Sequence, residues 1–249
     1  MLDGSGDALD GGCPYLRLMP RRPRSQLPGS IHHVTARGSR GGDVFLDNDD
    51  RQSFIAGLDD CCQLTGWTCI AFCLMTNHYH LLVELAAPRL SDGMHLLNTM
   101  HAVRFNRRHE RTGHVFDARF GSTTVDDAEH GEAVVRYIAL NPVRAGLCKR
   151  PEDWPWSSYS AAAGYSPTVP GVEPDQALRW FEGDREAMVA SVAAAIHRPP
   201  RPPLDDLLDG GTKEGILRAR RIYGYSQKEI ADFLGVSQPT VSRRIHGRE

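Results

Sequence analysis

The sequence predicts an α+β fold: a ferredoxin-like, split βαβ antiparallel sheet, followed by a small all-α helix-turn-helix domain. Two observations predict the sheet. Apolar and β-branched runs alternate with helical patterns in the order β-α-β-β-α-β-α, and a two-residue turn joins the second strand to the third. A third observation predicts the helical domain, because an Ala-Gly-Val spacing near the C-terminus separates two amphipathic segments.

The first half of the sheet is expected between residues 30 and 85. Residues 30–38 (SIHHVTARG) alternate loosely and are β-branched, which favours a strand. Residues 47–66 open with Asp and Asn caps, repeat apolar side chains at helical spacing and end in glycine, which predicts a helix. Residues 67–75 and 78–85 are apolar runs joined by a tight Thr-Asn turn, which predicts two paired strands.

The second half continues the same alternation. A helix is expected over residues 90–113, which end in glycine, and a short strand over residues 120–126. A second helix is expected over residues 127–142, where a proline should stop it. In the split βαβ pattern, we expect the helices to cover one face of the sheet.

The remaining chain divides into a connector and a second domain. Residues 150–167 are expected to be irregular, and residues 170–197 a short helical connector that leads into a Pro-rich linker at residues 197–203. The predicted organisation is a flexible leader (1–29), a catalytic domain (30–164), a connector with the linker (165–204) and a helix-turn-helix domain (205–249).

Composition favours a soluble globular protein. The chain has 249 residues, of which 41% are apolar and 24% charged. No apolar run approaches the roughly 20 residues that span a membrane, and the leader lacks the apolar segment of a signal peptide. We therefore expect no membrane partner, a cytoplasmic and nucleoid-associated protein, and reduced thiols for its six cysteines.

A zinc site is the alternative use of two of these cysteines. Cys69 and Cys73 could bind zinc together with His78 and His80. However, the chain has no CxxC pair, and thiols four residues apart on a strand share a face but lie too far apart for an easy chelate. We favour buried, unligated thiols.

Charge is close to balanced overall but is unevenly distributed. The net charge is −2, whereas residues 212–249 carry eight Lys or Arg against four Asp or Glu, a local excess of +4. A second basic cluster (VRFNRRHER) spans residues 103–111. Such patches let a near-neutral protein hold phosphates; the alternative is a solvated helix face. The candidate DNA contacts in the first domain are Arg104, Arg107, Arg108 and Arg119.

The C-terminal segment YSQKEIADFLGVSQPTVSRRIHG has the spacing of a helix-turn-helix. Ala231 is small where two helices would cross closely, and Gly235 permits a left-handed turn between them. The alternative is an α-hairpin that only packs on the core. The second helix would present residue types that reach bases and phosphates, namely Gln238, Thr240, Ser242, Arg243 and Arg244.

Two pairs of polar side chains predict a chemical site. His78 and His80 lie two apart on a strand, so both rings point to one face. Tyr137 and Asn141 lie four apart on a helix and share one of its faces. Imidazole and amide donors suit Mg²⁺ or Mn²⁺, and a phenol beside such an ion can attack a phosphodiester. The alternative is a structural pair of histidines on a half-buried strand.

Four motifs in order carry a resemblance to a known family. The segments NHYHLLVE, RTGHVFDARF, YIALNPVRAGL and WPWSSY together resemble the REP-associated tyrosine transposases, an IS200-like branch of the HUH single-strand transposases, over residues 30–164. The resemblance implies that His78, His80 and Asn141 bind the divalent metal. It also implies that Tyr137 forms a 5′-phosphotyrosine link with cleaved single-stranded DNA, whereas Tyr79 fills the hydrophobic position between the histidines.

The same resemblance implies the partner, a single-stranded hairpin of the repetitive extragenic palindrome type, and a monomer or homodimer. The C-terminal helices extend past the family core, and we expect them to add recognition of a duplex stem or to act in autoregulation.

A non-catalytic DNA-binding regulator with the same fold is the main alternative. A third interpretation is an RNA-binding ferredoxin-like domain. Such a domain is expected to expose aromatic pairs on its strands, and the strands predicted here lack them. One of His32 and His33 on the first strand could approach the site, but we favour a structural role. Aromatic stacking on bases is an alternative to packing on the core, which we favour, for Trp154, Trp156 and Tyr159.

Overall fold

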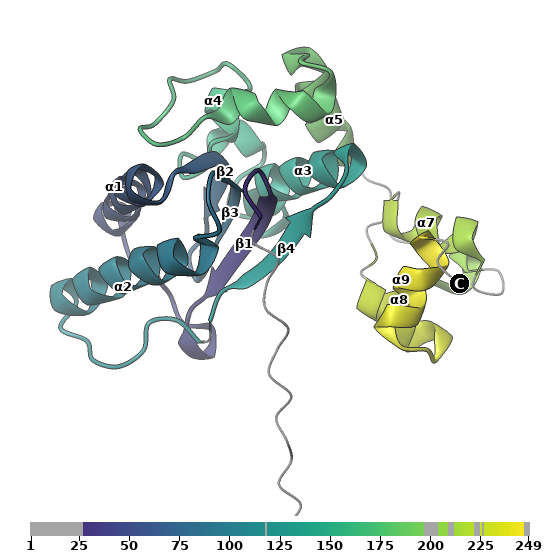
Figure 1. Ribbon diagram of the computed structural model, residues 1–249, viewed down its shortest axis with the longest axis horizontal. Helices are drawn as coiled ribbons and strands as arrows, with labels where there is room; N and C mark the ends of the chain where they lie inside the picture. Colours follow the sequence, from purple (N-terminus) through teal and green to yellow (C-terminus); the bar gives the residue numbers. More distant parts are fainter. Residues whose placement is uncertain are drawn as a thin grey trace, which may run out of the picture.

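The computed structural model describes residues 27–117, 119–196, 204–208, 212–221, 225 and 227–246, so most of the expected leader and the Pro-rich linker lie outside the described residues. One antiparallel sheet has the strand order β2-β3-β1-β4 (Figure 1). Its strands are β1 (Ile31–Arg37), β2 (Trp67–Leu74), β3 (His78–Leu85) and β4 (Gly121–Val125). The predicted α+β, split βαβ fold is therefore confirmed.

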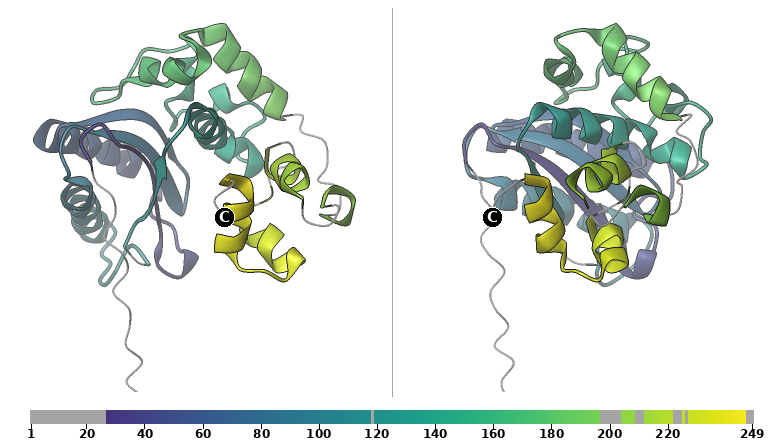
Figure 2. Two further views of the ribbon diagram at one scale, coloured as in Figure 1. Left: turned by 45° about the vertical axis from the view of Figure 1, so that its right-hand side comes forward. Right: turned by 90° about the vertical axis from the view of Figure 1, so that its right-hand side faces the viewer.

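Helices cover both faces of this sheet (Figure 2). α1 (Asn48–Thr65) and α2 (Leu90–Arg108) pack together on one face, whereas α3 (Ala128–Arg144) packs against β2 and β3 on the other. The expectation of helices on one face is correct for α1 and α2 and wrong for α3. The central strand β3 buries both of its faces, so the sheet needs cover on both sides.

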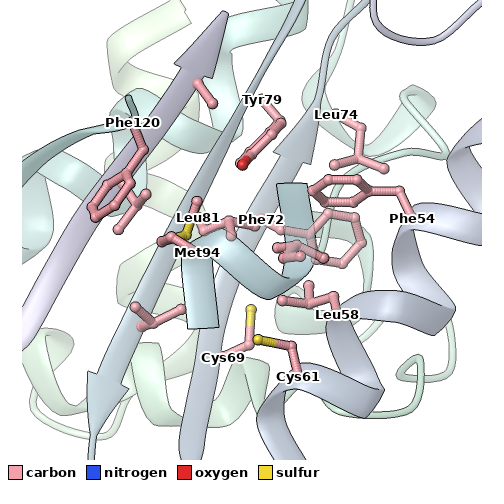
Figure 3. Close-up of a cluster of buried hydrophobic side chains, with 14 of the residues drawn as sticks. Phe54, Leu58, Cys61, Cys69, Phe72, Leu74, Tyr79, Leu81, Met94 and Phe120 are labelled. Atoms are coloured by element: carbon pink, nitrogen blue, oxygen red, sulfur yellow. The ribbon is translucent and has the colours of Figure 1, made fainter. Parts of the chain in front are cut away.

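The core between the sheet and α1 decides the direction of Tyr79 (Figure 3). Tyr79 is fully buried, its ring centroid lies 4.7 Å from that of Phe54, and its hydroxyl donates a hydrogen bond to Asn98. Its neighbours in β3, His78 and His80, point to the α3 face. The prediction that Tyr79 points away from the histidines is confirmed.

A bulge in β2 changes the prediction for the two strand cysteines. The β2–β3 register shifts between Cys69 and Ala71, which inserts one residue, Ile70, into the alternation. Cys69 therefore faces the α1 core beside Cys61 (Figure 3), whereas Cys73 faces the α3 core. The expectation that Cys69 and Cys73 share a face is wrong, and two thiols on opposite faces of a sheet do not bind one ion.

The helix ends predicted from the sequence are correct for α1 but not for α2 and α3. Gly66 ends α1 in the left-handed conformation with φ 73°, as predicted. α2 ends at Arg108 instead of near Gly113, because Glu110 adopts φ 52° and turns the chain out of the helix. α3 passes through Pro142 and ends at Arg144. A proline this close to the C-terminus removes a single helical hydrogen bond, so the last turn survives.

The segment after α3 packs on the same core. η2 (Pro151–Asp153) and α4 (Tyr159–Ala162) contact each other, and the segment between them runs beside β2, where Leu74 N–H donates to the Trp156 carbonyl at 2.8 Å. The 3-10 helix η3 (Pro174–Phe181) and α5 (Arg185–Ile196) follow, and both pack against α3. The segment expected to be a connector therefore carries helices that hold α3 in place. The remaining 3-10 turn, η1 (Ser39–Gly41), follows β1.

The C-terminal helices form a core of their own. They are α6 (Leu204–Leu207), α7 (Lys213–Arg221), α8 (Gln227–Leu234) and α9 (Gln238–His246). Ala231 is buried in this core, and Gly235 turns between α8 and α9 with φ 63°. The predicted helix-turn-helix is therefore confirmed. Among the described helices, none is long and apolar enough to cross a membrane.

Candidate functional site

Four of the predicted site residues meet between β3 and α3. Asn141 contacts both histidines: its Oδ1 lies 3.4 Å from His78 Nε2, and its Nδ2 lies 3.1 Å from His80 Nε2. The ring of Tyr137 meets the ring of His80 edge-on, with 5.1 Å between centroids. The strand period of two and the helical period of four thus bring both predicted pairs to one place.

Burial divides this site into two parts. His80 and Asn141 are 4% and 9% exposed, whereas Tyr137 is 40% exposed. The side chains of His80 and Asn141 are therefore buried, whereas the phenol of Tyr137 lies at the surface. A long polymeric substrate could reach the phenol without opening the fold.

The proton position on His78 follows from its other ring nitrogen. Asn77 Nδ2 donates to the Gly41 carbonyl at 3.1 Å, which turns Asn77 Oδ1 toward His78 Nδ1 at 2.8 Å. An amide oxygen only accepts, so His78 Nδ1 carries the proton. The Nε2 of neutral His78 then presents a lone pair toward Asn141.

His80 is held in a comparable way by a residue of β1. Its Nδ1 lies 3.1 Å from His33 Nε2, and the two rings stack with 5.3 Å between centroids. Burial, followed by the charges of His33 and His78, lowers the pKa of His80 to about 2. Burial, followed by His130, lowers the pKa of His33 to about 4. Both rings are therefore neutral near pH 7 and keep lone pairs available.

These donors fit a divalent cation. Oδ1 of Asn141 and Nε2 of His78 are both acceptors, and they face each other at 3.4 Å with no proton between them. A cation placed between them removes this mismatch. Ligand atoms held about 2.1 Å from an octahedral ion lie about 3 Å apart, close to the 3.4 Å between Asn141 Oδ1 and His78 Nε2.

Sequence reasoning missed Arg144. Its guanidinium lies 5.5 Å from the centroid of the Tyr137 ring, which places a positive charge beside the phenol. Arg144 lies seven residues, or two helical turns, after Tyr137 and therefore shares its face of α3. The seven-residue spacing could have identified Arg144 as a neighbour of Tyr137, but the predicted helix ended at Pro142, before it reached Arg144.

Asn77 was also missed as a site residue, and for His33 a structural role was favoured over an approach to the site. Of the two β1 histidines, His32 has the expected structural role, with ring nitrogens 2.9 Å from Ser30 Oγ and 3.2 Å from Ser122 Oγ. His33 points to the opposite face and contacts His80 instead. Strand alternation could have predicted that His32 and His33 point to opposite faces of the sheet. Only the pairing of β1 with β3, however, places His33 beside His80.

The predicted DNA contacts of α2 do not lie with this site, because α2 covers the other face of the sheet. Arg104 and Arg107 are exposed. Arg108 forms salt bridges with Asp47, Asp49 and Asp50 at 2.6, 3.0 and 2.7 Å. Its charge is thus used between α1 and α2, and the same arginine neutralises the acidic group near His109 that could otherwise attract an ion.

The other predicted DNA contacts are exposed or half-buried. Arg119 is exposed just before β4. In the C-terminal unit Gln238, Arg243 and Arg244 are exposed, whereas Thr240 and Ser242 are half-buried. The aromatic residues Trp154, Trp156 and Tyr159 pack on the protein, with the guanidinium of Arg51 5.9 and 5.7 Å from the two indole rings.

Two parts of the chain match known protein families. Residues 29–141 match the family described as "Transposase IS200 like", and residues 213–247 match "Sigma-70, region 4". A Haemophilus influenzae protein, named as a candidate REP-associated tyrosine transposase, is 25% identical over 111 aligned positions. These cover 39% of this chain and 62% of that relative, so the chain spans about three fifths of the relative's length.

A solved structure shares the fold. It is the REP-associated tyrosine transposase bound to a REP hairpin, which is similar to this chain with a TM-score of 0.50 and 19% identity. The likeness covers 60% of this chain and 89% of that one. Residues 29–141 are therefore similar to the IS200-like transposase family, and in this chain they are followed by C-terminal helices that match sigma-70 region 4.

Proposed function

We propose that this protein cleaves and rejoins single-stranded hairpin DNA through a 5′-phosphotyrosine intermediate on Tyr137. One observation carries the proposal: an accessible phenol on α3 lies against a sheltered set of metal-type donors formed by His78, His80 and Asn141. A nucleophile beside such donors is the arrangement needed to attack a polarised phosphodiester.

The chain's own residues perform the covalent step. Tyr137 Oη attacks the phosphorus, a bond forms between them, and the bond from phosphorus to the 3′-oxygen breaks. The phenol loses its proton, and the leaving 3′-oxygen gains one to become a hydroxyl. In the reverse sense, a 3′-hydroxyl attacks the phosphotyrosine and releases Tyr137, so the phosphodiester count is unchanged and no external energy source is needed.

The remaining groups set the electrostatics of that step. Mg²⁺ or Mn²⁺ held by His78, His80 and Asn141 would supply Lewis-acid polarisation of a phosphate oxygen. Arg144, beside the Tyr137 ring, would supply positive charge to the phosphate that Tyr137 attacks.

The substrate is proposed from the shape of the site and from the solved relative, which is bound to a REP hairpin. The exposed position of Tyr137 suits an unpaired strand, and the exposed arginines of α9 suit the duplex stem of the same hairpin. The competing proposal is a regulator that binds such DNA without cutting it. Intact Tyr137 and Asn141 favour the enzyme.

An adduct assay tests this function. The full chain is incubated with 5′- and 3′-labelled single-stranded hairpins from its own genome, with Mn²⁺, Mg²⁺ or EDTA, and resolved on a denaturing gel. We expect a covalent protein–DNA band that requires the metal and disappears in Tyr137→Phe. Tyr165→Phe, which removes the hydroxyl of a 59% exposed tyrosine elsewhere, is the matched control and should retain the band.

Two outcomes would contradict the proposal. Hairpin binding without any adduct in the wild-type chain supports the regulator. An adduct that persists in Tyr137→Phe shows that another residue is the nucleophile.

A further inference from the structure

The two histidines of the site reach Asn141 through Nε2, but a neutral imidazole can carry its proton on either nitrogen. Only the ring that carries its proton on Nδ1 presents a lone pair at Nε2. The residue that faces Nδ1 therefore decides whether each ring is ready to bind a cation.

For His78 the structure leaves one choice. The Asn77 side chain is fixed by its hydrogen bond to the Gly41 carbonyl, so its Oδ1 accepts from His78 Nδ1 at 2.8 Å. His78 Nε2 is thereby kept free of a proton.

For His80 two proton arrangements compete. In one, His80 Nδ1 donates to His33 Nε2 across 3.1 Å, and His80 Nε2 accepts from the Asn141 amide nitrogen. In the other, His33 donates, the Asn141 amide turns over, and His80 Nε2 carries the proton and has no lone pair for a metal. His33 can hold the first arrangement because its neutral ring has an acceptor nitrogen.

We propose that His33 and Asn77 are positioning residues that keep His80 and His78 in the metal-binding proton state. Neither residue touches the ion or the substrate in this role; each acts through the ring beside it. The inference rests on the proposed metal centre and adds two residues, from β1 and from the β2–β3 turn, that the four-residue set omits.

The test measures Mn²⁺ affinity by titration calorimetry on the full chain without DNA. His33→Leu fills the space without an acceptor, and we expect it to weaken Mn²⁺ binding about 10- to 100-fold, the usual effect of losing such a partner. His33→Gln places an amide oxygen at the position of Nε2, and we expect its affinity to return to within a few-fold of wild type.

Asn77 provides an independent arm. Asn77→Ala removes the acceptor and should weaken Mn²⁺ binding, whereas Asn77→Asp keeps an oxygen toward His78 Nδ1 and should retain it. His95→Ala, which removes an exposed histidine of α2, is the matched control and should bind as wild type does. Thermal unfolding of each variant separates loss of the fold from loss of affinity.

The possible failures are distinguishable. If wild type binds no Mn²⁺, the metal centre and this inference both fall. If His80→Ala loses binding while His33→Leu and Asn77→Ala bind as tightly as wild type, the centre stands and the positioning roles are wrong. Equal losses in His33→Leu and His33→Gln, with both folded, would overturn the hydrogen-bond explanation.

Discussion

At the scale of single residues, Tyr137 is held on two sides by other site residues. The edges of His80 and His33 approach its ring, with 5.1 and 5.7 Å between centroids, and Arg144 lies 5.5 Å from its centroid. The ring is thus positioned by contacts that do not use its hydroxyl group. This leaves the hydroxyl oxygen available for attack on a phosphate.

Arg144 gives a prediction at this scale. A charged contact to a phosphate contributes about 1.5–3 kcal/mol, and each 1.4 kcal/mol is tenfold in rate. We therefore expect Arg144→Gln to slow formation of the tyrosine adduct at saturating DNA by about tenfold or more, with Arg144→Lys in between. Lys149→Gln removes an exposed cation just after the helix and is the control. Unchanged adduct kinetics in Arg144→Gln would contradict the role.

At the scale of elements, α3 carries Tyr137 and Asn141, so its seating decides the geometry of the site. Trp180 of η3 packs directly against Gly131, where an added Cβ would lie 2.4 Å from ring atoms. This close approach anchors the N-terminal half of α3. Two helical glycines with different surroundings test its importance.

We expect Gly131→Ala to destabilise the fold and Gly57→Ala to stabilise it. Alanine gains about 1 kcal/mol of helix propensity over glycine, but overpacking a core costs about 1–3 kcal/mol. At Gly131 the clash with buried Trp180 prevails, for a net loss of up to about 2 kcal/mol. At Gly57 the nearest side-chain atoms would lie at 3.5 and 3.7 Å, an ordinary contact, so the propensity gain remains. Urea unfolding of both variants measures the two signs.

The junction of α1 and α2 predicts a dependence of stability on pH. Hydrogen bonds from Arg108 and from the Asp50 N–H lower the pKa of Asp47 to about 2, from an ordinary value of 3.8. Because the pKa of Asp47 is lower in the folded chain than in the unfolded chain, its ionised carboxylate stabilises the fold. This contribution is fully present above about pH 4 and is lost as the pH falls toward 2. Arg108→Gln should therefore unfold at lower urea than wild type at pH 6.

The difference between wild type and Arg108→Gln should shrink as the pH falls from 4 to 2, because protonation removes the ionic contact in wild type as well. Arg107→Gln changes an exposed arginine on the same turn of α2 and serves as the control. A difference that stays constant down to pH 2 would show that Arg108 stabilises the junction through packing instead of charge.

At the scale of the whole molecule, the predictable features are those that rest on local periodicity. The order of strands and helices follows from the apolar periodicity of each segment. The strand period of two predicts the pair His78 and His80, the helical spacing of four predicts the pair Tyr137 and Asn141, and a single glycine predicts the turn at Gly235. Two of the features that sequence reasoning missed depend on pairing between distant segments. The bulge at Ile70 and the contact of His33 with His80 exist only after the strands are aligned in register.

The second module provides the last prediction. The α6–α9 unit has its own core, and residues 213–247 within it match sigma-70 region 4. The exposed Arg243 and Arg244 of α9 suit contacts to duplex phosphates. Each lost phosphate contact lowers the slope of log affinity against log salt by about one. We therefore expect the double variant Arg243→Gln with Arg244→Gln to bind a hairpin stem more weakly and with a slope smaller by about two.

The same variant should form the tyrosine adduct at a normal rate once DNA saturates it, because Tyr137 and its neighbours lie between β3 and α3, outside the C-terminal helices. Lys228→Gln removes an exposed cation from α8, the first helix of the pair, and should change neither the salt slope nor the adduct rate. Stem affinity measured by fluorescence anisotropy across a salt series checks the first expectation. A collapse of the adduct rate at saturating DNA would show instead that α9 takes part in the cleavage step, and unchanged stem binding would show that α9 does not read the duplex.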